Sequence, residues 1–355
     1  MQKCVWLAVV AMACSPHKAS PPVTPPPVPA PAAPVAPAGP PTHVADANHL
    51  PLPGAGSGAV MMDYLVYDAR TQALWVPAGN TAAVDVVDVN TDKISQIPGF
   101  ATREVERHGH KRVVGPSSAT LGEPGTVYVG NRGDSSVCAF DEKSFAKGAC
   151  GTLDSMPDGI AYVAKTKEVW VTTPRDKSIR ILDANTLVQK AKLGFEGDPE
   201  GYAVDNTRGR FYTNLEDKDV TLSIALDTHK TVATWPSGCG EDGPHGLRLV
   251  EPDGQLVIAC SAALRTLDVV KGTVLGKLVV GDGVDDLDID RATRTVYAAG
   301  SRAATLAIAT LAKDGGLTLV AQPATAPGAR NGAVTEHGKF YVADGKVGEL
   351  IVVTH

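Results

Sequence analysis

Seven polar residues recur along the chain at intervals of 40 to 54 residues, each in the middle of a corner that precedes a short apolar segment. In chain order they are Asp63, Ser117, Asp158, Glu200, His245, Asp285 and Arg330. Carboxylates are hard oxygen ligands for cations, and an imidazole adds a nitrogen ligand. If the fold brings these corners together, Glu200, Asp158 and Asp285 form a candidate site for one divalent cation, Ca²⁺ or similar. Without a cation, crowding would raise some of their pKa values.

The corner residues also have a simpler structural use. Asp and Ser side chains at a turn accept hydrogen bonds from the backbone N–H groups that follow them. Glu200, His245 and Arg330 are poor turn formers, so for these three we favour ligand binding. Asn331 is a further candidate ligand beside Arg330. Glu200 and His245 are the candidate catalytic residues if the site belongs to an enzyme.

A second set of charged residues follows the aromatic segments of the repeat described next. Its basic members at candidate ligand-binding positions are Arg132, Arg175 and Arg302. An acidic centre inside a partly basic rim could hold a cation and an anionic ligand together. Charges on loops are usually only solvated, and that alternative stays open.

The elements that carry these residues repeat seven times. The clearest segments are QALWVPA, GTVYVGN, KEVWVTT, GRFYTNL, GQLVIAC, RTVYAAG and GKFYVAD, with Val257 in place of the aromatic in the fifth. Each unit also contains three further short apolar segments separated by turns, the pattern of a propeller blade. The sequence therefore predicts an all-β fold, a seven-bladed β-propeller with four-stranded blades.

Counting segments also predicts how the ring closes. The seventh unit supplies strands near 332–335, 339–343 and 349–353, and the chain then ends. Its missing outer strand is available from the segment near 49–60, where Pro51 and Pro53 are tolerable because the strand is an edge. The predicted propeller domain is 49–355.

The aromatic strand, the Pro-x-Gly-like corner and the third strand ending in Asp resemble the YVTN-repeat, YncE-like β-propellers of bacteria over essentially all of 61–355. The resemblance implies the fold more than a function, since such propellers include binding proteins, lactonases and quinoprotein-related enzymes. The resemblance also implies DNA binding, which is associated with the YncE-like family. A net charge of -6 opposes a nucleic-acid partner.

The N-terminal 48 residues do not follow the repeat. Residues 1–13 have the build of a secretion signal, and the Ala11–Cys14 end resembles a bacterial lipobox in which Cys14 would be lipidated. Residues 14–48 form a Pro/Ala-rich spacer that cannot bury a core. We expect an exported, periplasmic or cell-surface protein, anchored by lipid to the outer membrane. Ordinary signal cleavage giving a soluble periplasmic protein is the alternative.

Four cysteines remain outside the leader, an even number in a chain bound for an oxidising compartment. Cys138 and Cys150 flank a turn and could face each other across a hairpin. We predict the disulfides Cys138–Cys150 and Cys239–Cys260. A zinc site is the weaker alternative, because no close Cys-x-x-Cys pair occurs.

Two function hypotheses follow. The first is a membrane-anchored binding or scaffold propeller, monomeric, that takes a small molecule or a protein at the mouth of its central channel. The second is a metal-dependent hydrolase of lactonase type that uses the same site. The segment 286–290 lacks the glycine and glutamate of an EF-hand, and His108-Gly109-His110 lies among cations, which predicts a solvated loop there.

Overall fold

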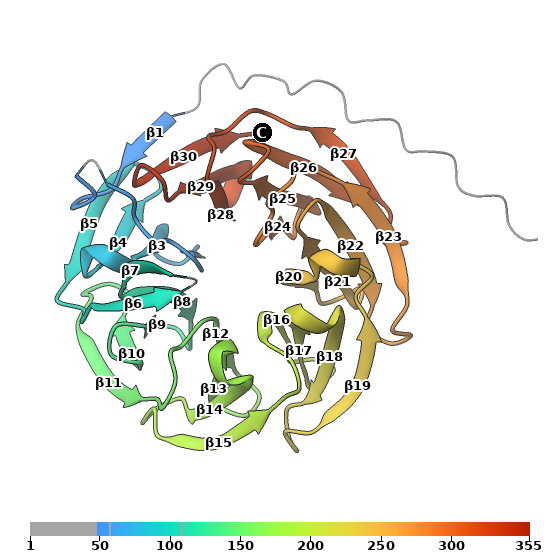
Figure 1. Ribbon diagram of the computed structural model, residues 1–355, viewed down its shortest axis with the longest axis horizontal. Coiled ribbons are helices and arrows are strands. Elements are labelled where there is room, and N and C mark those ends of the chain that lie inside the picture. Colours follow the sequence, from blue (N-terminus) through green and yellow to red (C-terminus); the bar gives the residue numbers. More distant parts are fainter. Residues whose placement is uncertain (1–47, 57, 108) are drawn as a thin grey trace, which may run out of the picture. The chain divides into compact units, whose positions relative to one another are not determined.

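The computed structural model describes residues 48–56, 58–107 and 109–355. The predicted leader, Cys14 and most of the spacer lie outside these residues. The described chain forms seven four-stranded antiparallel sheets arranged as blades around a central channel (Figure 1). The predicted all-β, seven-bladed propeller is therefore confirmed.

The blades follow one another in chain order, and each runs from its innermost to its outermost strand. Blade 1 has β2 (Val66–Asp68), β3 (Ala73–Ala78), β4 (Ala83–Asp88) and β5 (Lys93–Pro98). Blade 2 has β8 (Pro116–Leu121), β9 (Thr126–Asn131), β10 (Ser136–Asp141) and β11 (Lys147–Thr152). Blade 3 has β12 (Ile160–Val163), β13 (Glu168–Thr173), β14 (Ser178–Asp183) and β15 (Gln189–Gly194). Blade 4 has β16 (Pro199–Asp205), β17 (Arg210–Leu215), β18 (Val220–Ala225) and β19 (Thr231–Pro236).

The remaining blades keep this order. Blade 5 has β20 (Pro244–Val250), β21 (Gln255–Cys260), β22 (Ala263–Asp268) and β23 (Val274–Val279). Blade 6 has β24 (Asp288–Asp290), β25 (Thr295–Gly300), β26 (Thr305–Leu311) and β27 (Leu317–Ala321). Blade 7 has β28 (Ala329–Val334), β29 (Lys339–Asp344), β30 (Glu349–Thr354) and, as its outer strand, β1 (Asn48–Pro51). The described residues also contain five single 3₁₀ turns: η1 (Gly79–Thr81), η2 (Pro174–Asp176), η3 (Glu216–Lys218), η4 (Gly240–Asp242) and η5 (Glu336–Gly338).

The ring closes through β1. This strand pairs antiparallel with β30, with Asn48 opposite Val352 and Pro51 opposite Glu349. An ion pair of 2.7 Å between Nδ1 of His49 and Oε1 of Glu349 lies on the same pair of strands. In Figure 1 the blue N-terminal strand lies beside the red C-terminal blade, which confirms the predicted closure.

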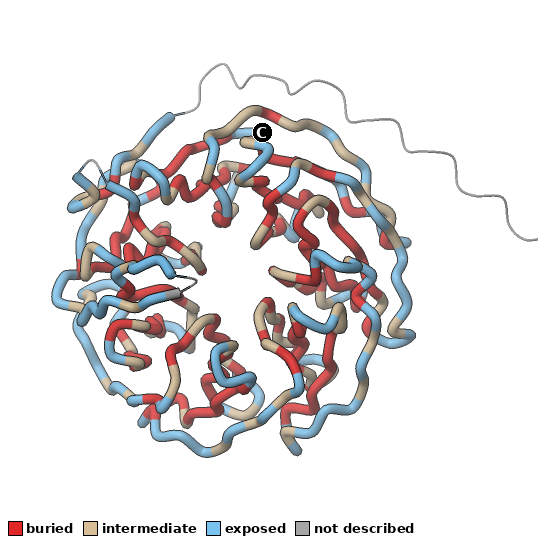
Figure 2. Tube along the Cα trace, in the orientation of Figure 1, coloured by how far each residue is buried: buried red, intermediate tan, exposed pale blue. Residues whose placement is uncertain are grey.

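The repeated aromatic position packs the blades against one another. Trp75, Trp170, Tyr212, Tyr297 and Tyr341 are almost completely buried in the second strands. Trp170 stacks on Phe211 of the next blade with ring centres 4.7 Å apart, and Tyr297 stacks on Phe340 at 5.0 Å. Figure 2 shows buried chain in the inner part of the ring and exposed chain along the outer strands. The aromatic residue therefore recurs once in each repeat because the blades use it to pack against one another.

Both predicted disulfides are present. Cys138 on β10 is bonded to Cys150 on β11, and Cys239 is bonded to Cys260 at the end of β21. The second bond ties the loop before β20 to the second strand of the same blade.

The chain around the predicted loop forms a two-stranded hairpin, β6 (Arg103–Arg107) and β7 (His110–Val114), inserted between blades 1 and 2. Gly109 and His110 are exposed, and His108 lies outside the described residues. Charged residues in both strands suit an exposed two-stranded sheet, and Nη2 of Arg103 donates to the carbonyl of Arg132 at 3.2 Å. Within the described chain there is no helix with the length and apolarity needed to cross a bilayer.

Asp85 on β4 is a fully buried carboxyl. Its Oδ1 accepts a hydrogen bond of 3.0 Å from Nε2 of Gln96, while Oδ2 has no hydrogen-bond partner among the described residues. Burial raises the pKa of Asp85 to about 6. Because the pKa is higher in the folded than in the unfolded chain, the folded state loses stability as the pH rises from about 4 through about 6.

Replacing Asp85→Asn should remove this loss, because an amide stays neutral. At pH 7.5 the free energy of unfolding should increase by up to about 3 kcal/mol, since a pKa difference of about two corresponds to that energy. Near pH 4 the variant and the parent should be equally stable. Urea unfolding at both pH values measures this. Asp88→Asn, at the exposed end of the same strand, is the control; a variant at Asp85 that is less stable at pH 7.5 contradicts the prediction.

Candidate functional site

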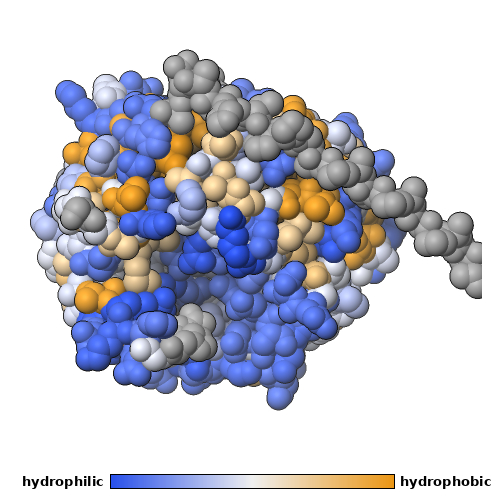
Figure 3. Space-filling model, turned by 45° about the horizontal axis from the view of Figure 1, so that its top comes forward, coloured by the Kyte–Doolittle hydropathy of each residue, from blue (hydrophilic) through white to orange (hydrophobic). Residues whose placement is uncertain are grey.

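The strand order of the blades places two kinds of loop on one face of the ring. Loops that enter the innermost strands and loops that follow the second strands both lie there, and they contact each other directly. In blade 4 the N–H of Glu216, which begins η3, donates to the carbonyl of Asp198 at 3.0 Å. We call the opening of the channel on this face the mouth. In the tilted view of Figure 3, hydrophilic residues surround the central hollow.

Arg132 holds two of the predicted corner residues together. Its Nη2 donates to Oδ2 of Asp63 at 2.6 Å and also to Oδ1 of Asp158, so one guanidinium bridges blades 1 and 3. Nδ2 of Asn331 donates to the other oxygen of Asp63 at 3.2 Å, and the hydroxyl of Tyr64 donates to Asp158 at 3.4 Å. These contacts join four blades.

Partial burial shapes the charges of this cluster. Burial raises the pKa of Asp158 to about 6, in opposition to Arg132, and the nearby Asp63 raises it further. Burial alone would lower the pKa of Arg132, but the two carboxylates outweigh it and raise that pKa above its ordinary value. The guanidinium therefore stays positively charged and pairs with both carboxylates.

A second cluster consists of Glu200, Glu216 and His245. One potential ligand atom from each of the three lies within 4.8 Å of the other two. Nδ1 of His245 is 3.3 Å from Oε1 of Glu216. Two carboxylates and one imidazole at this separation can hold a divalent cation, with the remaining positions open to a ligand.

Close approach of two inner strands makes this cluster possible. A Cβ on Gly201 would lie 2.2 Å from the carbonyl oxygen of His245, so β16 and β20 can meet here only because that residue is glycine. The neighbouring residues Glu200 and His245 are consequently brought to adjacent positions at the mouth.

The second cluster combines two carboxyl groups with one imidazole. Burial, followed by the proximity of Glu216, raises the pKa of Glu200 well above its ordinary value. For His245, burial lowers the pKa, but Glu216 and Asp285 outweigh it, so the pKa is raised. A cation that binds here would therefore have to displace protons from Glu200 and His245.

Arg330 and Asp285 complete the mouth. Nη1 of Arg330 lies 3.2 Å from Oδ1 of Asp285. Asp285 is the main cause of the raised pKa of Arg330, and Asp63 and Glu200 add to it. Since Arg330 interacts with members of both clusters, the mouth is one connected electrostatic site.

The other predicted residues lie as follows. Ser117 is buried at the corner of blade 2, and its hydroxyl has no hydrogen-bond partner in the part of the chain that the structure describes. Asn331 is buried beside Asp63, in a left-handed conformation (φ 58°) that asparagine tolerates. Arg175 is exposed on η2. Arg302 is also exposed, and its Nη2 pairs with Asp282 at 2.7 Å.

The structure brings together a different trio from the predicted metal set. Asp158 pairs with Arg132 and Asp285 with Arg330, so Glu200 is left beside Glu216 and His245. Glu216 belongs to the second set of charged residues, in the loops that follow the aromatic strands, but it was not one of the predicted metal ligands. The signal for it was the blade topology, which puts that loop beside the corner of the same blade.

Comparison with known proteins supports the fold alone. No family model and no curated protein sequence matches the chain. Virginiamycin B lyase from Staphylococcus aureus is similar in structure, with a TM-score of 0.68 and 11% identity over 87% of this chain and 99% of that one. Hydrazine synthase of Kuenenia stuttgartiensis gives 0.68 and 13% over 84% and 96%. A chain of the Mitotic Checkpoint Complex gives 0.68 and 12% over 87% and 93%.

Replacing Arg132→Gln should destabilise the propeller by about 3 kcal/mol, because it leaves two partly buried carboxylates without their cation. Adding Asp63→Asn and Asp158→Asn to that variant should recover a large part of the loss, since the repulsion disappears with the charges. Urea unfolding of the two variants measures the coupling. Equal stability of the single and triple variants would show that the three side chains do not act as a unit.

Proposed function

We propose that this protein is an exported binding propeller that takes a small polar ligand at the channel mouth. The observation that carries the proposal is the convergence of Asp63, Asp158, Glu200, His245, Asp285 and Arg330 into one connected site. Two disulfides agree with an oxidising compartment. The lipid anchor at Cys14 in the bacterial outer membrane is part of the proposal and rests on the sequence.

The charges of the mouth indicate what it binds. Five carboxylates, Asp63, Asp158, Glu200, Glu216 and Asp285, face two guanidiniums, and those two already pair with three of the aspartates. Glu200 and Glu216 lie beside each other and beside His245. A divalent cation held by these three would neutralise the excess and offer open positions to an oxygen atom of a ligand.

Titration of chelator-treated protein with Ca²⁺, Mn²⁺ or Zn²⁺ tests this site. Calorimetry should show one bound ion, and Glu216→Gln or His245→Ala should lower the affinity at least tenfold. The affinity should also fall as the pH is lowered from 8 to 6, because protons compete for Glu200 and His245, whose pKa values are raised.

Asp227→Asn is the matched control, an exposed carboxylate in the loop between β18 and β19 on the opposite face. It should leave the affinity unchanged. The absence of metal-induced stabilisation in the unaltered protein, or an equal loss of affinity in the control, contradicts the cation site.

A metal-dependent hydrolase of lactonase type is the second candidate. His245 favours it, because an imidazole with a raised pKa beside the candidate cation can hold or deliver a proton during hydrolysis. The cation, when bound, would polarise the carbonyl of the lactone. In the hydrolase, Glu200 and Glu216 would hold the cation while His245 exchanges the proton, and Arg330 lies close enough to orient an anionic group.

Assay of metal-loaded protein with aliphatic and aromatic lactones separates the two candidates. The hydrolase predicts turnover that His245→Ala reduces at least a hundredfold while metal still binds. Metal binding without turnover leaves a binding protein. A protein ligand at the same face is the other form of the binding proposal, and the similar chain of the Mitotic Checkpoint Complex is part of such an assembly.

A further inference from the structure

The central channel contains a second cavity, of about 470 Å³, that the mouth does not include. Its lining comes from the innermost strands of all seven blades and from the turns that follow them, where Glu251 and Arg291 lie. Those turns are on the face opposite the mouth. We call this cavity the chamber. Its volume is within the range of small-molecule sites, about 300–1,000 Å³.

Two tyrosines separate the chamber from the mouth. The rings of Tyr64 and Tyr202 lie 5.6 Å apart at an angle of 43°. The hydroxyl of Tyr64 faces the mouth, where it donates to Asp158. The hydroxyl of Tyr202 accepts a hydrogen bond of 3.1 Å from the backbone N–H of Ile160. Its own hydrogen has no acceptor in the part of the chain that the structure describes.

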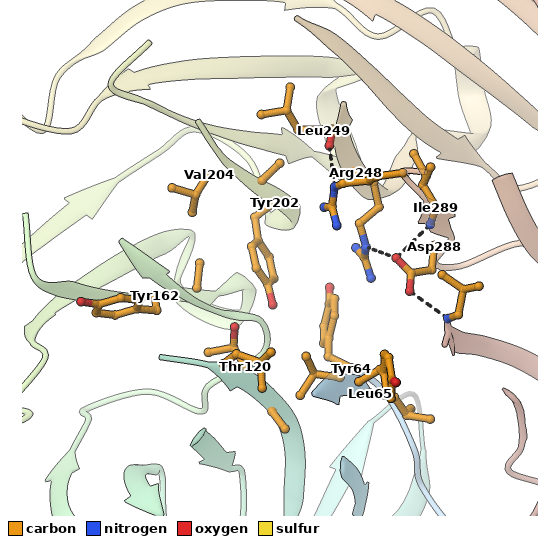
Figure 4. A pocket seen from close by; sticks show the side chains of 18 of the residues that line it. Tyr64, Leu65, Thr120, Tyr162, Tyr202, Val204, Arg248, Leu249, Asp288 and Ile289 are labelled. Carbon is orange, nitrogen blue, oxygen red and sulfur yellow. Dashed lines mark hydrogen bonds and ion pairs between the residues drawn. The ribbon is translucent and has the colours of Figure 1, made fainter. Parts of the chain in front are cut away.

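Arg248 supplies charge in the wall of the chamber. Its Nη2 donates to Asp286 at 2.7 Å, and its Nε lies 3.4 Å from Oδ1 of Asp288. Figure 4 shows Arg248, Tyr64 and Tyr202 directed toward one another, whereas Tyr162 points away. One N–H of Nη2 and one oxygen lone pair of Asp288 remain available, because Oδ2 of Asp288 accepts only from the N–H of Val334 among the described groups.

The chamber therefore combines three features. The tyrosine rings and the aliphatic side chains of Ala161, Ala203 and Leu249 line the chamber with apolar surface. Tyr202, Arg248 and the hydroxyl of Thr120, which makes no hydrogen bond within the described chain, offer donors, and Asp288 offers an acceptor beside them. The charged residues of the lining are Arg248, Arg291, Glu251 and Asp288, two of each sign, so the chamber favours a neutral ligand over an ion.

A hydroxyl group both donates and accepts, so it matches an arginine–aspartate edge, and the C–H face of a sugar ring matches an aromatic ring. We propose that the chamber binds a neutral sugar of one or two rings, entering from the face opposite the mouth. This site is separate from the one in the proposed function and needs no metal ion.

Ligand-observed NMR and calorimetry with glucose, galactose, maltose, cellobiose and lactose test the proposal on the chelator-treated protein. At least one of these sugars should bind with a Kd of about 1 mM or lower. Glucuronate should bind more weakly than the matching neutral sugar, because Asp286 and Asp288 already pair with Arg248 and oppose a further carboxylate.

Three variants locate the binding. Tyr202→Phe removes a donor but keeps the ring, and should weaken sugar binding about five- to tenfold. Tyr64→Phe, whose lost hydroxyl faces the mouth, should leave the affinity within about twofold. Glu200→Gln should also leave it unchanged. The melting temperatures of all three confirm folding.

No binding of any of the five sugars at about 10 mM would overturn the proposal. An equal loss of affinity in both tyrosine variants would also overturn it. Binding abolished by Glu200→Gln would assign the sugar to the mouth instead, and the chamber proposal would be wrong while the mouth remained a ligand site.

Discussion

Closing seven blades into one ring brings the starts of all innermost strands to the same small space, and the rest of the site depends on this convergence. Each corner carries a polar residue, so carboxylates from distant parts of the sequence become neighbours in a partly dehydrated environment. Such charges must be neutralised, because a buried charge without a partner is costly. Arg132 neutralises Asp63 and Asp158, and Arg248 neutralises Asp286.

The distribution of these pairs decides where ligand chemistry can occur. Asp63 and Asp158 share a guanidinium on one side of the mouth, and on the other side Glu200 and Glu216 lie beside the imidazole of His245. The raised pKa of Glu200 is the physical consequence. A carboxyl whose pKa is raised by burial and by a second carboxyl group beside it is a place where a cation can replace the proton.

The fold could be predicted from the sequence because its packing repeats. The buried aromatic of each second strand recurs with the blade, so Trp170 and Tyr297 mark both the period and the contact with the next blade. The closing strand and the two disulfides followed from counting segments and cysteines. The hairpin β6–β7 was missed because it interrupts the repeat, and nothing in the period of the blades specifies an insertion.

The composition of the site could be predicted only in part. Alignment of the repeats shows which residues occupy equivalent positions in the blades, but it does not show which side chains contact one another. Glu200 and His245 were found as unusual corner residues, whereas Glu216 is adjacent to them through a different loop.

The chamber was missed for another reason. Tyr64, Tyr202 and Arg248 stand one, two and three positions after their corners, so their meeting in the channel depends on the twist of each inner strand. Tyr64 contacts both compartments, since its ring lines the chamber and its hydroxyl reaches Asp158. A ligand that displaces that ring would therefore act on the carboxylate cluster as well.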